Sequence, residues 1–170
     1  MKTITSILIP TDFSELSLIA TEYVKMLSKP GATHIYLFHA IPEVMHAYSY
    51  PTVDLNSETI LRDSEEIARE ELRHLANDQF GKNNNVTVDI RRGEPWREIV
   101  KFAQEEGIDL IVMATHGRTG FAHVLLGSVA EKVVRHANVA VMTIKPEKMQ
   151  NPMHEEQMLV QIPHGDNSVL

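Results

Sequence analysis

A glycine-rich segment in the second half of the sequence has the residue types of an anion site. It runs from Ala114 to Glu131 and contains Gly117 and Gly127-Ser128. Glycine lets a backbone approach a ligand closely and adopt positive φ. Gly127-Ser128 opens a predicted helix, and Ser128 and Glu131 match the Ser-x-x-Glu capping box. The amides and dipole at such a helix start favour a phosphate group, with ordinary turn chemistry as the alternative.

The glycine spacing differs from two common nucleotide motifs. Gly127-Ser128 has neither the Gly-x4 spacing before it nor the lysine that a Walker A loop requires. The segment also lacks the G-x-G-x-x-G pattern, which argues against a dinucleotide. If Gly127-Ser128 binds a phosphate, it therefore does so as a helix start that matches neither of these motifs.

The elements that must position this segment alternate along the chain. Five apolar or alternating runs predict strands, and four segments with helical periodicity lie between them. The predicted strands span residues 6–10, 34–40, 86–90, 109–114 and 139–144. The predicted helices span residues 14–27, 60–80, 95–107 and 128–136. This order predicts an α/β fold with a single open five-stranded parallel sheet, Rossmann-like, and helices on both faces.

Ligands of such sheets bind at the carboxyl ends of the strands, near the topological switch point. Three segments are predicted to lie there: residues 10–14, 40–42 and 114–128. The long connection from Pro42 to Asn56 is a candidate lid. The apolar residues of the second helix predict its inner face, and its acidic run predicts a solvated outer face. The predicted inner residues are Ile60, Leu61, Ile67, Ala68, Leu72, Leu75 and Ala76.

Composition excludes several function classes. The formal net charge is −7, which argues against general nucleic-acid binding, because neutralising the phosphates requires clustered Lys and Arg. There is no cysteine, so disulfides and cysteine-based zinc sites are excluded. The nine histidines form no metal-ligand motif, so no protein-built metal site is expected. No run is long and apolar enough for a membrane span or signal peptide, which predicts a cytoplasmic protein.

Two separated motifs resemble the universal stress protein family. The first is Ile7-Leu-Ile-Pro-Thr-Asp-Phe-Ser14, and the second extends from Thr115-His-Gly-Arg-Thr-Gly through Leu-Leu-Gly-Ser-Val-Ala-Glu to Ala137. The closing strand Val139–Lys145 is similar as well. The resemblance covers residues 4–146 and implies the family's nucleotide-binding domain over residues 1–146, followed by a C-terminal extension over 147–170. That extension is expected either to be disordered or to dock on a partner subunit.

The resemblance also implies an ATP site. Family members that bind ATP carry Gly-x2-Gly-x9-Gly-Ser/Thr, and this chain reads Ala114-x2-Gly117-x9-Gly127-Ser128. Ala114 stands in place of the first glycine, and this difference bears on the affinity for ATP more than on the position of the site. By resemblance, Pro10, Thr11 and Asp12 would meet adenine and ribose, and Ile41 would offer backbone groups to adenine. Met113 and Ala114 would line the nucleotide. The phosphates would be surrounded by His116, Gly117, Gly127, Ser128, Val129 and Ala130.

Several of these residues have a second interpretation. Asp12 can accept hydrogen bonds from both ribose hydroxyls, or it can cap the first helix. His116 fits an electrostatic or structural role better than acid–base catalysis, because no carboxylate or nucleophile is paired with it. Arg118 is either a phosphate-side charge or a surface charge. Mg²⁺ would be held mainly through the phosphates.

The implied function is that of a stress-response sensor in which adenine-nucleotide occupancy alters partner binding or assembly. The resemblance implies a homodimer through strand Val139–Ile144, which closes the sheet as an apolar edge, and a regulatory protein partner. An enzyme, at most a slow ATPase or a phosphoryl or nucleotidyl transferase, is one alternative. A dimerisation module with a vestigial site is the other.

Overall fold

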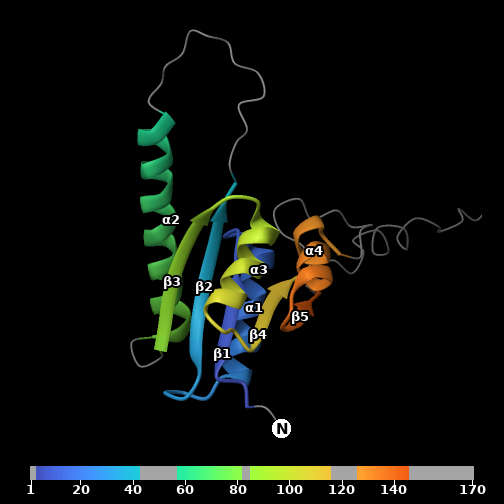
Figure 1. The fold of residues 1–170 in the computed structure, drawn as a ribbon. Helices are drawn as coiled ribbons and strands as arrows, with labels where there is room; N and C mark the ends of the chain where they lie inside the picture. The colour runs from blue at the N-terminus through green and yellow to red at the C-terminus, as the bar shows by residue number, and fades with distance from the viewer. Residues whose placement is uncertain (1–2, 43–56, 82–84, 116–125, 146–170) are drawn as a thin grey trace, which may run out of the picture.

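The computed structural model describes residues 3–42, 57–81, 85–115 and 126–145. The predicted lid, the middle of the glycine-rich segment and the C-terminal extension lie outside these residues, apart from Pro42 at the start of the lid. Strands and helices alternate along the described chain (Figure 1). The strands are β1 (Ser6–Pro10), β2 (His34–Ile41), β3 (Asn85–Arg92), β4 (Leu110–Ala114) and β5 (Ala140–Ile144). The helices are α1 (Glu15–Leu27), α2 (Ser57–Phe80), α3 (Pro95–Glu105) and α4 (Ser128–His136).

The strands form one five-stranded sheet in the order β3-β2-β1-β4-β5, and every neighbouring pair is parallel. The α/β prediction is therefore confirmed. The chain moves outward from β1 through β2 to β3, and then crosses to β4 and β5 on the other side. The direction in which successive strands are added to the sheet reverses between β1 and β4. The carboxyl ends of these two strands therefore flank the topological switch point.

Two apolar cores, one on each face of the sheet, hold the layers together. Residues of α1 and α2 pack with Ile7, Ile9 and Leu37 on one face. Residues of α3 and α4 pack with Leu8 and Phe38 on the other face. Successive residues of a strand point to opposite faces, which explains why β1 and β2 contribute to both cores. All five residues of β4 are buried, as expected for a strand between β1 and β5.

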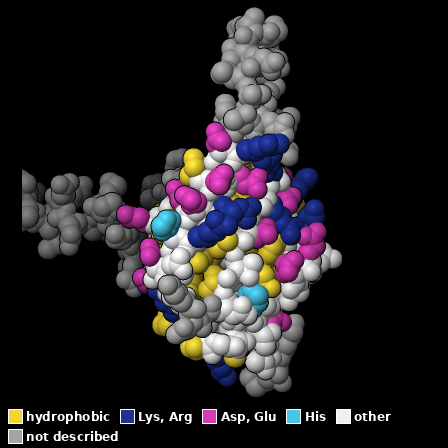
Figure 2. Space-filling view, turned by 90° about the vertical axis from the view of Figure 1, so that its left-hand side faces the viewer, with side chains coloured by type: hydrophobic (Ala, Val, Ile, Leu, Met, Phe, Trp, Pro, Cys, Tyr) yellow, Lys and Arg dark blue, Asp and Glu magenta, His cyan; other side chains and the backbone are white. Residues whose placement is uncertain are grey.

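The outward face of α2 and the adjacent strand β3 carry intermixed charges. Figure 2 shows acidic and basic side chains close together on this side of the molecule, with apolar side chains between them. Glu65 of α2 pairs with Arg69 on the same helix at 3.2 Å and with Arg92 of β3 at 3.0 Å. Exposed pairs of this kind contribute about 0–1 kcal/mol each. The prediction of a solvated outer face is consistent with this arrangement.

The structure corrects one residue of the predicted inner face of α2. Ala68 and Leu72 are buried and Leu75 and Ala76 are partly buried, but Ile67 is 61% exposed. Ile67 immediately precedes Ala68 in the helix, and a step of 100° turns its side chain away from the sheet. The side chains of Ile60 and Leu61 lie outside the described part of the chain.

This correction yields a matched prediction on one helix. Leu72→Ala is expected to lower the free energy of unfolding by about 2–5 kcal/mol, because a fully buried side chain leaves a cavity. Ile67→Ala, five residues away, is expected to change it by no more than about 0.5 kcal/mol. Urea unfolding of both variants measures the difference, and equal losses in the two variants would contradict the observed orientation of α2.

Candidate functional site

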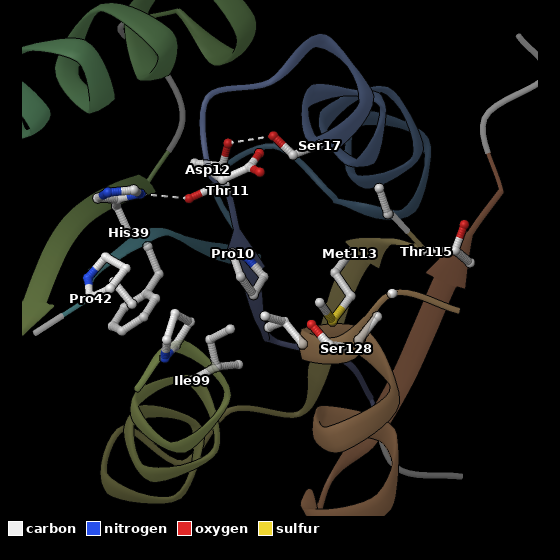
Figure 3. Close-up of a pocket in the computed structure, with 17 residues that line it drawn as sticks. Pro10, Thr11, Asp12, Ser17, His39, Pro42, Ile99, Met113, Thr115 and Ser128 are labelled. Atoms are coloured by element: carbon white, nitrogen blue, oxygen red, sulfur yellow. Dashed lines mark hydrogen bonds between the residues drawn. The ribbon is translucent and has the colours of Figure 1, made fainter. Parts of the chain in front are cut away.

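A cavity of about 400 Å³ opens at the carboxyl ends of the strands. Its walls come from β1, β2, β4, the starts of α1, α3 and α4, and the segment that follows each of these strands (Figure 3). The lining residues are Pro10, Thr11, Asp12, Ser17, Phe38, His39, Ala40, Pro42, Pro95, Ile99, Met113, Ala114, Thr115, Gly127, Ser128, Val129 and Ala130. This volume is within the range of small-molecule pockets.

The start of α4 forms one wall of the cavity. Gly127 is the N-cap, with φ −66° and ψ 157°, and no side chain caps it. Its amide donates to the carbonyl of Thr115 at 2.7 Å, and its carbonyl accepts the amide of Glu131 at 2.9 Å. The first-turn amides of Ser128, Val129 and Ala130 have no intrahelical acceptor by helix geometry. Together with the helix dipole, they make this wall suitable for an anion.

The predicted capping box does not form. The helix begins one residue earlier than that motif requires, so Ser128 is its first helical residue and not its cap. The Glu131 carboxylate instead pairs with Arg135 one turn further along, at 2.7 Å. As a result, the capping-box hydrogen bonds do not occupy the amides at the start of α4.

The turn between β1 and α1 forms a second wall. Asp12 lies in this turn and lines the cavity. One of its carboxylate oxygens, Oδ1, accepts the amide of Ser14 at 3.1 Å and the hydroxyl of Ser14 at 2.6 Å. Ser14 in turn caps α1 by accepting the amide of Ser17. Asp12 therefore orients the cap of α1, but Ser14 and not Asp12 is the cap itself. The Asp12 carboxylate lines the cavity at the same time.

The rest of the lining is mostly apolar. Pro10, Phe38 and Met113 come from three neighbouring strands. Ile99 comes from α3 and lies near Pro10 and Met113 (Figure 3). Phe38, Met113 and Ile99 are buried. Such a surface suits a flat, weakly polar ring. The cavity thus combines an apolar part with a carboxylate on one wall and helix amides on another.

An ion pair connects the two helices that border the cavity. Glu94, the N-cap of α3, accepts from Lys132 of α4 at 2.9 Å and pairs with Arg97 at 3.1 Å. The hydrogen bond from Lys132 holds the pKa of Glu94 below its ordinary value. A carboxyl whose pKa is depressed in the folded state contributes stability above its ordinary pKa and loses that contribution as the pH falls through the depressed value. The link between α3 and α4 is therefore expected to weaken only in acid.

The structure brings most of the predicted site residues together. Nine of them line the cavity: Pro10, Thr11, Asp12, Met113, Ala114, Gly127, Ser128, Val129 and Ala130. Ile41 lies beside the cavity without lining it, and its carbonyl accepts the amide of Gly93 at 3.0 Å. The remaining three, His116, Gly117 and Arg118, lie outside the described residues.

Sequence reasoning missed several lining residues. Phe38 and His39 lie near the end of β2, while Pro95 and Ile99 come from the start of α3. Ala40, which also lines the cavity, lies in the predicted segment 40–42. The rule that ligands bind at strand carboxyl ends pointed to the end of β2 but not to individual side chains.

In the ranges that the structure describes, no cluster of three or more metal-ligating side chains occurs. No described helix has the length and hydropathy of a membrane span.

Known proteins resemble this chain over the same region. A model of the universal stress protein family matches residues 3–145. Universal stress protein MJ0577 of Methanocaldococcus jannaschii is 32% identical over 82% of this chain and 93% of its own length. Universal stress protein MJ0531 of the same organism is 33% identical over 84% of this chain and 82% of its own length.

The fold agrees with the sequence comparison. The solved structure of MJ0577 superposes with a TM-score of 0.76, at 32% identity, over 86% of this chain and 99% of the other. The family match includes β1, β4, β5 and the start of α4, the elements that carry both sequence motifs. The chain therefore belongs to the universal stress protein family.

Proposed function

We propose that this protein binds ATP, or a related adenine nucleotide, in the cavity at the carboxyl ends of the strands. The observation that carries the proposal is the presence of two complementary walls around one cavity. The amides at the start of α4 suit phosphates, and Asp12 suits the hydroxyls of a ribose. The apolar surface between them suits the base. We assign this function to a domain over residues 1–146.

Two proteins of the same fold support an adenine nucleotide as the ligand. A universal stress protein family member from Arabidopsis thaliana was solved with AMP bound, at 21% identity and a TM-score of 0.59. Another universal stress protein was solved in complex with cAMP, at 20% identity and a TM-score of 0.54. At these identities the likeness concerns the fold, so the choice of ATP rests on the motif and on the walls of the cavity.

Mg²⁺ is proposed to accompany the nucleotide through its phosphates. Asp12 is the one acidic side chain among the described residues that line the cavity. A single carboxylate is a small ligand set for this metal, which commonly binds through substrate phosphates and water. His116, Gly117 and Arg118 remain proposed phosphate neighbours.

Nucleotide occupancy is proposed to act as a regulatory signal for an unidentified protein partner. A ligand changes assembly only if it binds one state more tightly than another. The site carries no described pair of nucleophile and base, which favours binding over rapid turnover. Slow hydrolysis remains the enzymatic alternative, and a vestigial site in a dimerisation module remains the third.

Titration calorimetry tests the proposal after a denatured sample has been checked for co-purified nucleotide. Micromolar binding of ATP with Mg²⁺, with release of ADP that is slow or absent, is the expected result. Catalytic turnover that is lost when Asp12 or His116 is replaced would favour the enzyme. A nucleotide-free, folded sample that binds no ATP would favour the vestigial site and contradict the proposal.

We further propose a homodimer through β5. This strand is an edge of the sheet, and one of its two sides has no partner strand within the described chain. The strand begins with the apolar residues Ala140, Val141 and Met142. An apolar edge strand of this kind can pair with the same strand of a second copy.

Val141→Lys is expected to shift the dimer toward monomer by at least about tenfold in dissociation constant, because an interface would then bury an unpaired charge. Sedimentation velocity measures the change. Ile67→Lys controls for the added charge, since Ile67 is an exposed apolar residue of α2, which packs near the opposite edge. Thermal unfolding of the Val141 variant monitors its fold, because Val141 packs partly buried against one core. An unaltered mass for the Val141 variant alongside a dimeric parent would exclude this edge as the interface.

A further inference from the structure

His39, at the carboxyl end of β2, binds the backbone of the turn that carries Asp12. Its Nδ1 lies 2.8 Å from the carbonyl oxygen of Thr11 (Figure 3). A carbonyl oxygen only accepts, so Nδ1 must carry a proton and donate it. Nδ1 carries that proton in the charged imidazolium and in one neutral tautomer.

The register of the sheet places the two residues next to each other. Pro10 of β1 is opposite Phe38 of β2, so the next residue of each strand extends past the last pair of the β1–β2 ladder. The Thr11 amide still donates to the Phe38 carbonyl at 2.9 Å. With the imidazole on its carbonyl, both backbone polar groups of Thr11 are bound to β2. The start of the turn is thus attached to the sheet through consecutive residues of one strand.

Hydrogen bonds continue from Thr11 through the turn. The Thr11 hydroxyl oxygen accepts the amide of Phe13 at 2.9 Å and lies 2.8 Å from the hydroxyl of Ser17. Ser17 donates its own proton to the carbonyl of Ser14 at 2.8 Å. Asp12 lies between these bonded residues and accepts from Ser14. The position of the Asp12 carboxylate therefore depends on the position of Thr11.

The turn also contains a conformation that needs external support. Phe13 has φ +64°, a left-handed conformation that is an outlier for a bulky residue. Such conformations persist where surrounding contacts enforce them. The Phe13 ring lies against the His39 ring, with 4.6 Å between the ring centroids and 38° between the planes. His39 therefore holds the turn at two points, through the Thr11 carbonyl and through the Phe13 ring.

We propose that His39 is a positioning residue for recognition of the ribose. It holds the β1–α1 turn so that the Asp12 carboxylate faces the ribose hydroxyls, and it acts through Thr11 rather than by contact with the sugar. This role rests on the proposed nucleotide site and adds to it the residue on which hydroxyl recognition depends.

The test compares ATP with 2′,3′-dideoxy-ATP, which lacks both ribose hydroxyls. The wild-type protein is expected to bind ATP at least about tenfold more tightly, since hydrogen bonds to a charged group are strong. His39→Phe keeps a ring against Phe13 but removes the donor. The ratio of its dissociation constants for 2′,3′-dideoxy-ATP and ATP is expected to fall toward one. His39→Asn keeps an N–H donor bonded to Cγ, and it is expected to restore at least half of the preference on a logarithmic scale.

His34→Phe is the matched control. His34 lies at the other end of β2, stacks on Tyr36 with 4.3 Å between centroids, and contacts the Thr87 hydroxyl through Nε2 at 2.8 Å. This variant removes a hydrogen-bonding imidazole from the same strand away from the cavity, and it should keep the wild-type preference. Calorimetry supplies each dissociation constant, and thermal unfolding monitors the fold.

The outcomes separate the two proposals. A wild-type protein that binds neither nucleotide would contradict the proposed function itself. A folded His39→Phe variant with the full wild-type preference would overturn the role of His39 while leaving the ATP site in place. Nitrogen NMR of the wild-type imidazole tests the same role without a variant, because a neutral ring protonated on Nε2 instead of Nδ1 could not donate to Thr11.

Discussion

Replacing Gly127 with valine is expected to weaken ATP binding by roughly a hundredfold or more without unfolding the protein. The backbone of Gly127, at φ −66° and ψ 157°, lies in an extended region that valine adopts readily. The added side chain would occupy space at the cavity wall, where the α4 amides are proposed to meet the phosphates. Losing two charge-assisted hydrogen bonds, at about 1.5–3 kcal/mol each, accounts for the size of the effect.

Two companion variants make this result specific. Gly127→Ala adds a smaller group and is expected to give an intermediate loss of affinity. Ser28→Val places the same valine at an extended helix-flanking position, the C-cap of α1, with φ −78° and ψ 146°. Ser28 follows α1 at the end of the sheet where β2 begins, so ATP binding should not change. Calorimetry measures all three, and a folded Gly127→Val protein with wild-type affinity would remove the α4 amides from the site.

Replacing Asp12 with asparagine is expected to weaken ATP binding by about tenfold to a hundredfold. Asparagine keeps an oxygen that can accept the Ser14 amide, so the cap of α1 should survive. It lacks the negative charge, and one of its two polar atoms becomes a donor that cannot accept from a ribose hydroxyl. A hydrogen bond to a charged group contributes about 1.5–3 kcal/mol, which corresponds to this range of affinity.

The Asp12 variant also predicts a change in selectivity. Its affinities for ATP and for 2′,3′-dideoxy-ATP should become nearly equal, because the hydroxyls would no longer have their acceptor. Asp78→Asn on the exposed side of α2 removes the same charge away from the cavity and should change neither affinity. Equal binding of the two nucleotides by the wild-type protein would show that Asp12 does not recognise the ribose.

Local sequence pattern was enough to predict the order of elements and the end of the sheet at which the cavity lies. Residues Ile7 to Pro10 and the whole of the fully buried strand Leu110–Ala114 are apolar, because both faces of an interior strand are covered. The alternation of strands and helices then restricts the topology. Since the carboxyl ends of parallel strands meet at one edge, the sequence alone predicts Asp12 and Gly127 in the same region.

The details that depend on tertiary register could not be predicted in this way. Ile67 fits an apolar helical stripe, yet the rotation of α2 against the sheet exposes it. Ser128 fits a capping motif, but the helix starts after Gly127 and Glu131 pairs with Arg135. The contact between His39 and Thr11 depends on the pairing of β1 with β2, which no local pattern encodes.

The most direct test of the central claim is an NMR titration of the nitrogen-15-labelled protein with ATP and Mg²⁺. Binding in the cavity predicts saturable shifts of the Thr11, Asp12 and Ser128–Ala130 amides, which lie on two walls of one cavity. Amides at the opposite end of the sheet, such as those of Thr33 and Asp109, should remain in place. Saturable shifts confined to another surface, or no shifts at millimolar ATP in a nucleotide-free sample, would contradict the claim.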